Sequence, residues 1–302
     1  MSIVDRIQGL LQDPPPEFAF EIGADGIAMS RTRPPATVQV TPLAGGVLSP
    51  SPVKENILDA AAYAEAVKKV MPPANSRGRR TAALILPDYS LRLALLEFEN
   101  IPQKETERVA LLRFRLRKTV PFEIDEAALA YHVQPGNSVV AAITPAGTVA
   151  HYEAPFRAAG MHPGFVTASS LALLELLPPR GFLLVANLAP GALSVLAIKD
   201  GIVQLARSLE LGESVDDPLD EISSDLYPTL VYLEDQTGAR PEKLILSGFG
   251  ADSASAAMRL SIELEIEAEI LREKHAGLAG YLASLARAKS PPAKSIARKV
   301  AA

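Results

Sequence analysis

Few residues in this chain have the type and spacing that catalysis or metal binding requires. The sequence contains no cysteine, which excludes disulfides, thiolate catalysis and cysteine-based zinc sites. Its four histidines never approach the spacing of metal ligands, so we interpret them as ordinary surface or core residues and expect no metal site. The sequence has no Walker A loop and no G-x-S-x-G elbow. What remains is a set of glycine turns that follow apolar segments.

Three such turns divide the chain. The first is Glu21-Ile22-Gly23-Ala24-Asp25-Gly26, within an alternating segment that predicts a hairpin at 18–30. The second begins at Asn187, within 182–209, where we expect two buried strands, a turn and a third strand. The third is the G-F-G of K-L-I-L-S-G-F-G-A-D at 243–252. Glycine permits tight turns and close backbone approach, but the first motif alone is typical of an ordinary hairpin.

The segment from 83 to 122 is the one around which we organise the rest. It predicts a strand, a turn at Pro87-Asp88, a second strand at 91–98 and a helix that ends before Pro121. Acidic residues occupy the first turns of this helix and basic residues the last, as the helix dipole favours. Its apolar residues recur on one face, namely Val109, Leu112 and Leu116.

This arrangement resembles the PilM family, actin-like cytoplasmic proteins of type IV pilus assembly that are related to the cell-division protein FtsA. The resemblance covers about 18–287 and rests on the order of elements and on two local matches, 83–122 and K-L-I-L-S-G-F-G-A. It implies an α/β, actin-like (ribonuclease H-like) duplicated fold with an inserted α+β subdomain, 1C, of the SHS2 type. We therefore expect an N-terminal extension at 1–17, subdomain 1A at 18–90 plus 166–180, subdomain 1C at 91–165, a second actin-like subdomain at 181–287, and a basic disordered tail at 288–302.

Two further helices complete this expectation. Apolar periodicity predicts one at 55–70, and Pro145 begins another that Gly160 ends, which we assign to 1C. A short amphipathic helix at 1–11 either packs on its own domain or frays, or it contacts a membrane surface or a partner helix.

The resemblance also implies what the glycine turns would do. In the actin fold the first turn cradles phosphates, and an aspartate just before it holds magnesium. The family pattern is D-I-G-S-S-S-V-K, but this chain has Glu21 in place of the aspartate and Ala28 in place of the lysine. Asp25 would place a carboxylate where a phosphate should lie, which costs several kcal/mol at about 4 Å and an effective dielectric near 20.

The second and third motifs depart in the same way. Where the family has D-x-G-x-x-x-T, Asn187 is neutral and Pro190 removes a backbone N–H from the loop. Phe249 replaces the second glycine of L-S-G-G-G-A, and we expect it to fill the pocket rather than to stack on a base. We thus expect no catalysis and no cofactor, with ATP and magnesium as the alternative. The degenerate cleft would comprise Glu21, Gly23, Asp25, Asn187, Gly191, Gly248, Phe249 and Gly250.

The function that the resemblance implies is that of a non-catalytic adaptor in the type IV pilus inner-membrane platform. Such a protein binds the cytoplasmic N-terminal tail of a PilN-like membrane protein in a groove between 1A and 1C, lined in part by the opening hairpin and the 1C helix. Arg108, Arg113 and Arg115 would flank that groove or face other pilus assembly proteins, unless they form only a solvated helix face. The alternatives are an actin-like ATPase with altered motifs and the cytoplasmic module of a type II secretion platform, which normally continues into a membrane span.

Length and charge agree with this class. The chain has 302 residues, a net charge of -5 and a pI near 5.5, so we expect no nucleic-acid partner. No apolar run reaches the roughly 18 residues that a membrane span needs, and no signal-peptide core begins the chain. We expect a soluble cytoplasmic protein at the inner face of the membrane, held there only through partners.

Overall fold

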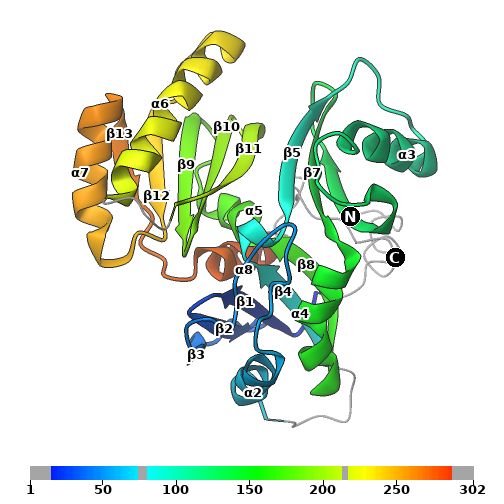
Figure 1. The fold of residues 1–302 in the computed structure, drawn as a ribbon. Helices are drawn as coiled ribbons and strands as arrows, with labels where there is room; N and C mark the ends of the chain where they lie inside the picture. The colour runs from blue at the N-terminus through cyan, green and yellow to red at the C-terminus, as the bar shows by residue number, and fades with distance from the viewer. Residues whose placement is uncertain (1–14, 74–79, 213–216, 288–302) are drawn as a thin grey trace, which may run out of the picture.

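The computed structural model describes residues 15–73, 80–212 and 217–287 (Figure 1). The expected helix at 1–11 and the basic tail at 288–302 lie outside these residues. Within the described ranges, no helix is both long enough and apolar enough to cross a bilayer.

The first half of the molecule is built on a five-stranded sheet of order β3-β2-β1-β4-β8. β1 pairs antiparallel with β2 and parallel with β4, and β8 extends the sheet in parallel. Helices α2 (Ala60–Val70) and α4 (Ala146–Ala158) cover one face. The strands are β1 (Phe18–Gly23), β2 (Gly26–Arg31), β3 (Gln39–Pro42), β4 (Arg80–Leu86) and β8 (Met161–Ala168).

The second half repeats this topology in the order β11-β10-β9-β12-β13. As in the first half, the first three strands pair antiparallel. The two later strands then extend the sheet in parallel from the other edge of the first strand, β9. Helices α6 (Pro218–Thr237) and α7 (Ser253–Leu264) cover one face through a shared apolar core. The strands are β9 (Phe182–Ala189), β10 (Ala192–Lys199), β11 (Ile202–Glu210), β12 (Lys243–Ser247) and β13 (Glu267–Ile270). The expectations from sequence did not include α7 and β13.

An α+β lobe interrupts the first half between β4 and α4. Its sheet has the order β5-β7-β6, and helix α3 packs on one face through Leu112 and Leu116. The other face shares an apolar core with the second sheet. The lobe comprises β5 (Arg92–Glu97), α3 (Glu105–Leu116), β6 (Ala127–Val133) and β7 (Ser138–Pro145).

The structure corrects three assignments that the sequence suggested. Residues 146–165 lie in the first half and not in the insertion, because β8 pairs with β4 and α4 packs on the first sheet through Tyr152 and Phe156. Helix α8 (Ala276–Arg287), assigned to the second half, packs instead on the uncovered face of the first sheet with α5 (Ser169–Leu173). The helix expected at 55–70 begins only at residue 60, since Asp59 caps it and Ile57 bridges to Leu48.

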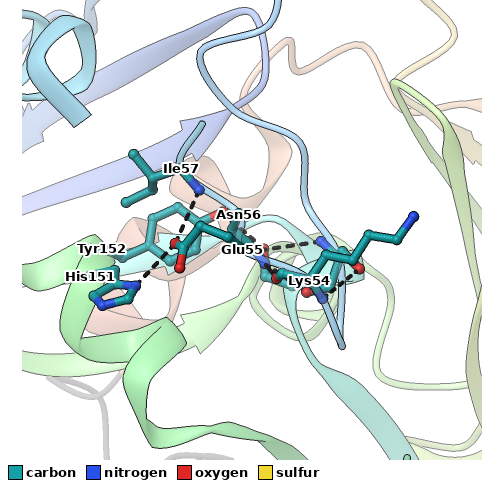
Figure 2. Close-up of polar contacts among 8 residues, drawn as sticks. Lys54, Glu55, Asn56, Ile57, His151 and Tyr152 are labelled. Carbon is teal, nitrogen blue, oxygen red and sulfur yellow. Dashed lines mark hydrogen bonds and ion pairs between the residues drawn. The ribbon is translucent and has the colours of Figure 1, made fainter. Parts of the chain in front are cut away.

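Figure 2 shows the polar contacts that tie α4 to the loop before α2. The buried amide of Asn56 donates from Nδ2 to the carbonyls of Ser51 (2.7 Å) and Lys54 (2.8 Å), and its Oδ1 accepts from the hydroxyl of Tyr152 at 3.2 Å. The Tyr152 hydroxyl also lies 3.0 Å from Ser90 Oγ, where the chain enters the insertion. This network therefore fixes the base of the inserted lobe on the first half.

The inserted lobe is also bonded to the second half. Gln134 follows β6 and is buried. Its side-chain amide makes two hydrogen bonds to the backbone of Val203 in β11, as the backbone of a neighbouring strand would. Its Oε1 accepts from the Val203 N–H at 2.8 Å, and its Nε2 donates to the Val203 carbonyl at 3.1 Å. At the opposite end of β11, Tyr89, which precedes β5, donates to Glu210 Oε2 at 3.1 Å. The insertion thus bridges both halves.

Candidate functional site

A polar cleft of about 180 Å³ lies between the two halves, where the glycine turns meet. Small-molecule sites usually measure about 300–1,000 Å³, so this cleft is small. It is lined by five of the predicted residues: Glu21, Gly23, Asp25, Asn187 and Gly248. The other three, Gly191, Phe249 and Gly250, are not among its lining residues.

Glu21 is bonded to helix α8. Its Oε2 accepts the N–H of Leu278 at 2.9 Å, while Oε1 accepts from Ser169 Oγ at 2.7 Å and from the N–H of Gly277 at 3.3 Å. A Cβ on Gly277 would stand 2.7 Å from Glu21 Oε1, so glycine is required for this approach. Burial raises the pKa of Glu21, and the N–H groups oppose that shift. The carboxylate thus caps the positive end of α8 in the place where an anion would otherwise bind.

Asn187 is held by a residue that sequence reasoning did not select. Asp88, which is buried, follows β4 and accepts from Asn187 Nδ2 at 3.0 Å through Oδ2. Its Oδ1 accepts the N–H of Ser170 at 2.8 Å. Burial raises the pKa of Asp88, while the bonds from Ser170 and Asn187 lower it. Because Asp88 belongs to the first half and Asn187 to the second, this pair connects the two halves at the floor of the cleft.

The third motif also contributes to packing. Gly248 has a φ of 84°, and a Cβ there would lie 2.0 Å from the carbonyl oxygen of Leu188 in β9. Phe249 is buried in the core that α6 and α7 share with the second sheet. The Phe249 ring thus packs in that core and does not line the cleft, and the expectation that it fills a nucleotide pocket stays a prediction.

The remaining residues that were predicted for the cleft lie in turns, and Gly191 and Gly250 do so outside its lining. Asp25 is exposed at the tip of the β1–β2 hairpin, and its carbonyl accepts the N–H of Leu43 at 2.9 Å. Gly191 connects β9 to β10 with a φ of 73°, and Gly250 ends the G-F-G turn with a φ of 58°. Pro190 lines the cleft without an N–H to offer.

The three arginines expected at a partner surface all make contacts within the insertion. Arg108 donates to the Tyr131 hydroxyl at 2.9 Å and lies over that ring. Arg113 donates to the carbonyls of Ile124 and Ala127 and so holds the segment before β6 against α3. Arg115 lies over the Phe98 ring, 5.2 Å from its centroid, and is exposed. Arg113 therefore has an internal structural role, while Arg115 remains accessible.

An apolar groove of about 90 Å³ lies between the inserted lobe and the first half. It is bordered by β6 and β8, the end strands of their sheets. The opening hairpin and α3, which we expected to line a groove between 1A and 1C, do not line this one. Most of its lining side chains are apolar, among them Ala128, Ala130, Val149, Phe165, Val166 and Leu171. Phe165 stacks on Tyr281 of α8, with the ring centroids 5.2 Å apart. The wall of the groove at Phe165 is therefore packed against α8.

The repeated strand order around a central cleft defines an actin-like fold with an α+β insertion. Among solved structures, a chain of the PilM–PilN type IV pilus biogenesis complex is similar over 90% of this chain and 99% of its own length, with a TM-score of 0.73 and 20% identity. An actin-like ATPase-fold protein of Bacteroides thetaiotaomicron (TM-score 0.52, 14% identity) covers 88% of this chain and 94% of its own. The cytoplasmic domain of EpsL from the Vibrio cholerae type II secretion system (0.53, 12%) covers 90% and 94%.

These comparisons confirm the expected actin-like fold and its likeness to PilM at the level of structure. No protein-family model matches the chain, and no curated protein matches its sequence. The likeness thus lies in the arrangement of elements rather than in sequence.

Proposed function

We propose that this chain is a non-catalytic, actin-like adaptor of a type IV pilus assembly platform at the inner face of the cytoplasmic membrane. In this role it binds the cytoplasmic N-terminal tail of a PilN-like membrane protein, contacts other pilus assembly proteins, and reaches the membrane through that partner. The likeness to a chain of the PilM–PilN complex over almost its whole length supports this assignment.

The observation that carries the proposal is the groove between β6 and β8. End strands carry backbone N–H and C=O groups that an extended peptide can pair with, and the apolar lining provides a surface for its alternate side chains. Hydrogen bonds among Asn56, Tyr152 and Ser90 fix the base of the inserted lobe on the first half. The positions of β6 and β8 relative to each other are therefore set before a peptide binds.

Isothermal titration with a synthetic N-terminal peptide of a PilN-type protein tests this proposal. Ala130→Glu places a carboxylate in the apolar groove, and we expect at least a tenfold loss of affinity, which is about 1.4 kcal/mol. Met258→Glu on α7 is the matched control, because Met258 is 68% exposed and lies outside the groove. Equal binding by the wild type and Ala130→Glu would contradict the assignment. Arg115→Glu tests in the same assay whether the exposed Arg115 contacts the peptide. Weaker binding by this variant would support such a contact.

The absence of catalysis is part of the proposal and is supported by the use of the cleft side chains. Glu21 caps α8, Asn187 is bonded to Asp88, and Gly248 is packed against β9. A nucleotide would have to displace these contacts. We expect titration with ATP and magnesium to give no binding heat, and micromolar affinity would instead support the ATPase alternative.

The likeness to the EpsL domain supports a second candidate, a module of a type II secretion platform. Its TM-score of 0.53 is lower than the 0.73 found for the pilus protein, which is why we place it second. Binding of a secretion-platform peptide in preference to the PilN-type peptide would reverse this order.

A further inference from the structure

Two exposed helices carry opposite charge. Helix α6 contains five acidic residues and no basic one: Asp220, Glu221, Asp225, Glu234 and Asp235. The last turn of α3 and the residues after it read R-F-R-L-R-K at 113–118, with four basic residues and no acidic one. Each segment therefore carries charge of a single sign, in a chain whose net charge is only -5.

Both helices also expose large apolar or aromatic side chains. Phe114 on α3 is 70% exposed, and on α6 Tyr227 and Tyr232 are 57% and 51% exposed, with Val231 at 45%. Solvated aromatic residues beside arginines are the composition typical of protein interfaces, and contiguous exposed apolar surface usually marks an interaction site. Single exposed residues need no explanation, but here they coincide with the charged segments.

Much of this charge is not used within the molecule. Asp220 and Asp225 pair with Arg259 and Arg207, and after α3 Arg117 pairs with Asp125 at 3.2 Å. Among the described residues, no ion pair involves Glu234, Asp235 or Lys118. Glu234, Asp235 and Lys118 are thus available for a partner, and the exposed pair of Arg117 with Asp125 can be exchanged for one across the contact.

The two surfaces cannot meet within one chain. In Figure 1, α6 (yellow) lies at the upper outer edge of the second half, while α3 (green) lies at the opposite outer edge of the inserted lobe. Each surface borders a hollow, lined beside α6 by Asp225, Thr229 and Tyr232 and after α3 by Arg117, Pro121 and Phe122, into which side chains of a second copy could fit. The two surfaces carry opposite charge and each has exposed apolar side chains. They can therefore bind each other when they belong to two copies of the chain.

We propose that the α3 surface (Phe114, Arg115, Arg117 and Lys118) docks on the α6 surface (Tyr227, Val231, Tyr232, Glu234 and Asp235) of a second copy of this chain. The two patches differ, so the contact is head-to-tail and leaves one patch of each kind free at the ends. Such a contact produces an open chain or a ring rather than a two-fold dimer.

Sedimentation velocity on the full chain over a concentration series tests the proposal. We expect the weight-average sedimentation coefficient to rise with concentration at about 0.1 M NaCl and to rise less at about 1 M, where the Debye length falls from about 10 Å to about 3 Å. Glu234→Lys/Asp235→Lys and Arg117→Glu/Lys118→Glu should each weaken self-association at least tenfold, because like charges then face each other.

Mixing the two variants is the decisive experiment. The reversed α6 of one variant faces the reversed α3 of the other, and the two native surfaces also match, so an equimolar mixture should regain concentration-dependent assembly. Phe114→Ser, which keeps every charge, should also weaken association if the apolar centre contributes. A wild-type chain that stays monomeric would overturn the proposal, and so would assembly that neither charge variant weakens or that the mixture fails to restore.

Discussion

Asn187→Asp would restore the aspartate that the actin-like motif carries and would place two carboxylates against each other in a buried site. The Asn187 Nδ2 to Asp88 Oδ2 distance is 3.0 Å, and two unit charges that far apart repel by about 5 kcal/mol at an effective dielectric of about 20. Proton uptake by one carboxyl limits this cost, so we expect a loss of about 3–5 kcal/mol of unfolding free energy near neutral pH. At about 2–4 °C per kcal/mol, the melting temperature falls by about 10 °C.

The pH dependence has a definite sign. Repulsion raises the folded-state pKa of one carboxyl, so the folded variant binds more protons than the unfolded chain between the unfolded pKa near 4 and that raised value. Stability is therefore retained at low pH and is lost as the pH rises through the raised pKa. The difference in melting temperature between Asn187→Asp and the wild type should be larger at pH 8 than at pH 5, measured by thermal denaturation with circular dichroism.

The matched control exchanges the two groups. In Asp88→Asn/Asn187→Asp the amide and the carboxylate swap places, the hydrogen bond across the cleft is retained, and the N–H of Ser170 still finds an acceptor at residue 88. We expect this double variant to recover most of the lost stability. A single variant as stable as the wild type at pH 8, or a double variant no better than the single one, would refute the reasoning.

Three further substitutions test other contacts. Gly248→Ala should destabilise by several kcal/mol, because its Cβ would lie 2.0 Å from a carbonyl oxygen of β9, whereas Gly191→Ala, also at positive φ but in open space, should cost about 1 kcal/mol by urea denaturation. Glu21→Gln sets an amide donor against a backbone N–H of α8 and should cost about 1–3 kcal/mol, seen as a lower urea midpoint. Gln134→Ala removes both hydrogen bonds to the Val203 backbone, so the Val203 amide should exchange hydrogen faster. An unchanged exchange rate would show that the Gln134 side chain does not protect this amide.

The order of elements could be predicted from sequence because each glycine hairpin has a local signal. The residues around the tight turns predicted the hairpin at 18–30 and the three strands within 182–209, and acidic and basic ends predicted α3. Helix α4 was assigned to the wrong lobe because its apolar face, Tyr152 and Phe156, does not reveal which sheet it covers. Only the pairing of β8 with β4 does so.

The internal roles of the site residues were harder to predict, because their partners lie far away along the chain. Asp88 stands in a Pro-Asp turn that any loop could contain, and its partner Asn187 is 99 positions away. Glu21 was interpreted only as the replacement for a magnesium-binding aspartate, whereas in the structure it caps a helix more than 250 residues later. The groove likewise combines end strands of two sheets, which no local pattern could bring together.

The placement of α8 has a consequence for biosynthesis. Residues 276–287 are translated after both sheets, yet Leu278 and Tyr281 cover the first sheet, which contains Ala19 and Ala83. While a ribosome is still making the second half, one face of the earlier half is therefore bare of its helix, and the Glu21 carboxylate lacks two of its donors. A nascent chain that is halted before residue 276 should accordingly be sensitive to protease in its first half. Folding of the first half is complete only after α8 has been synthesised.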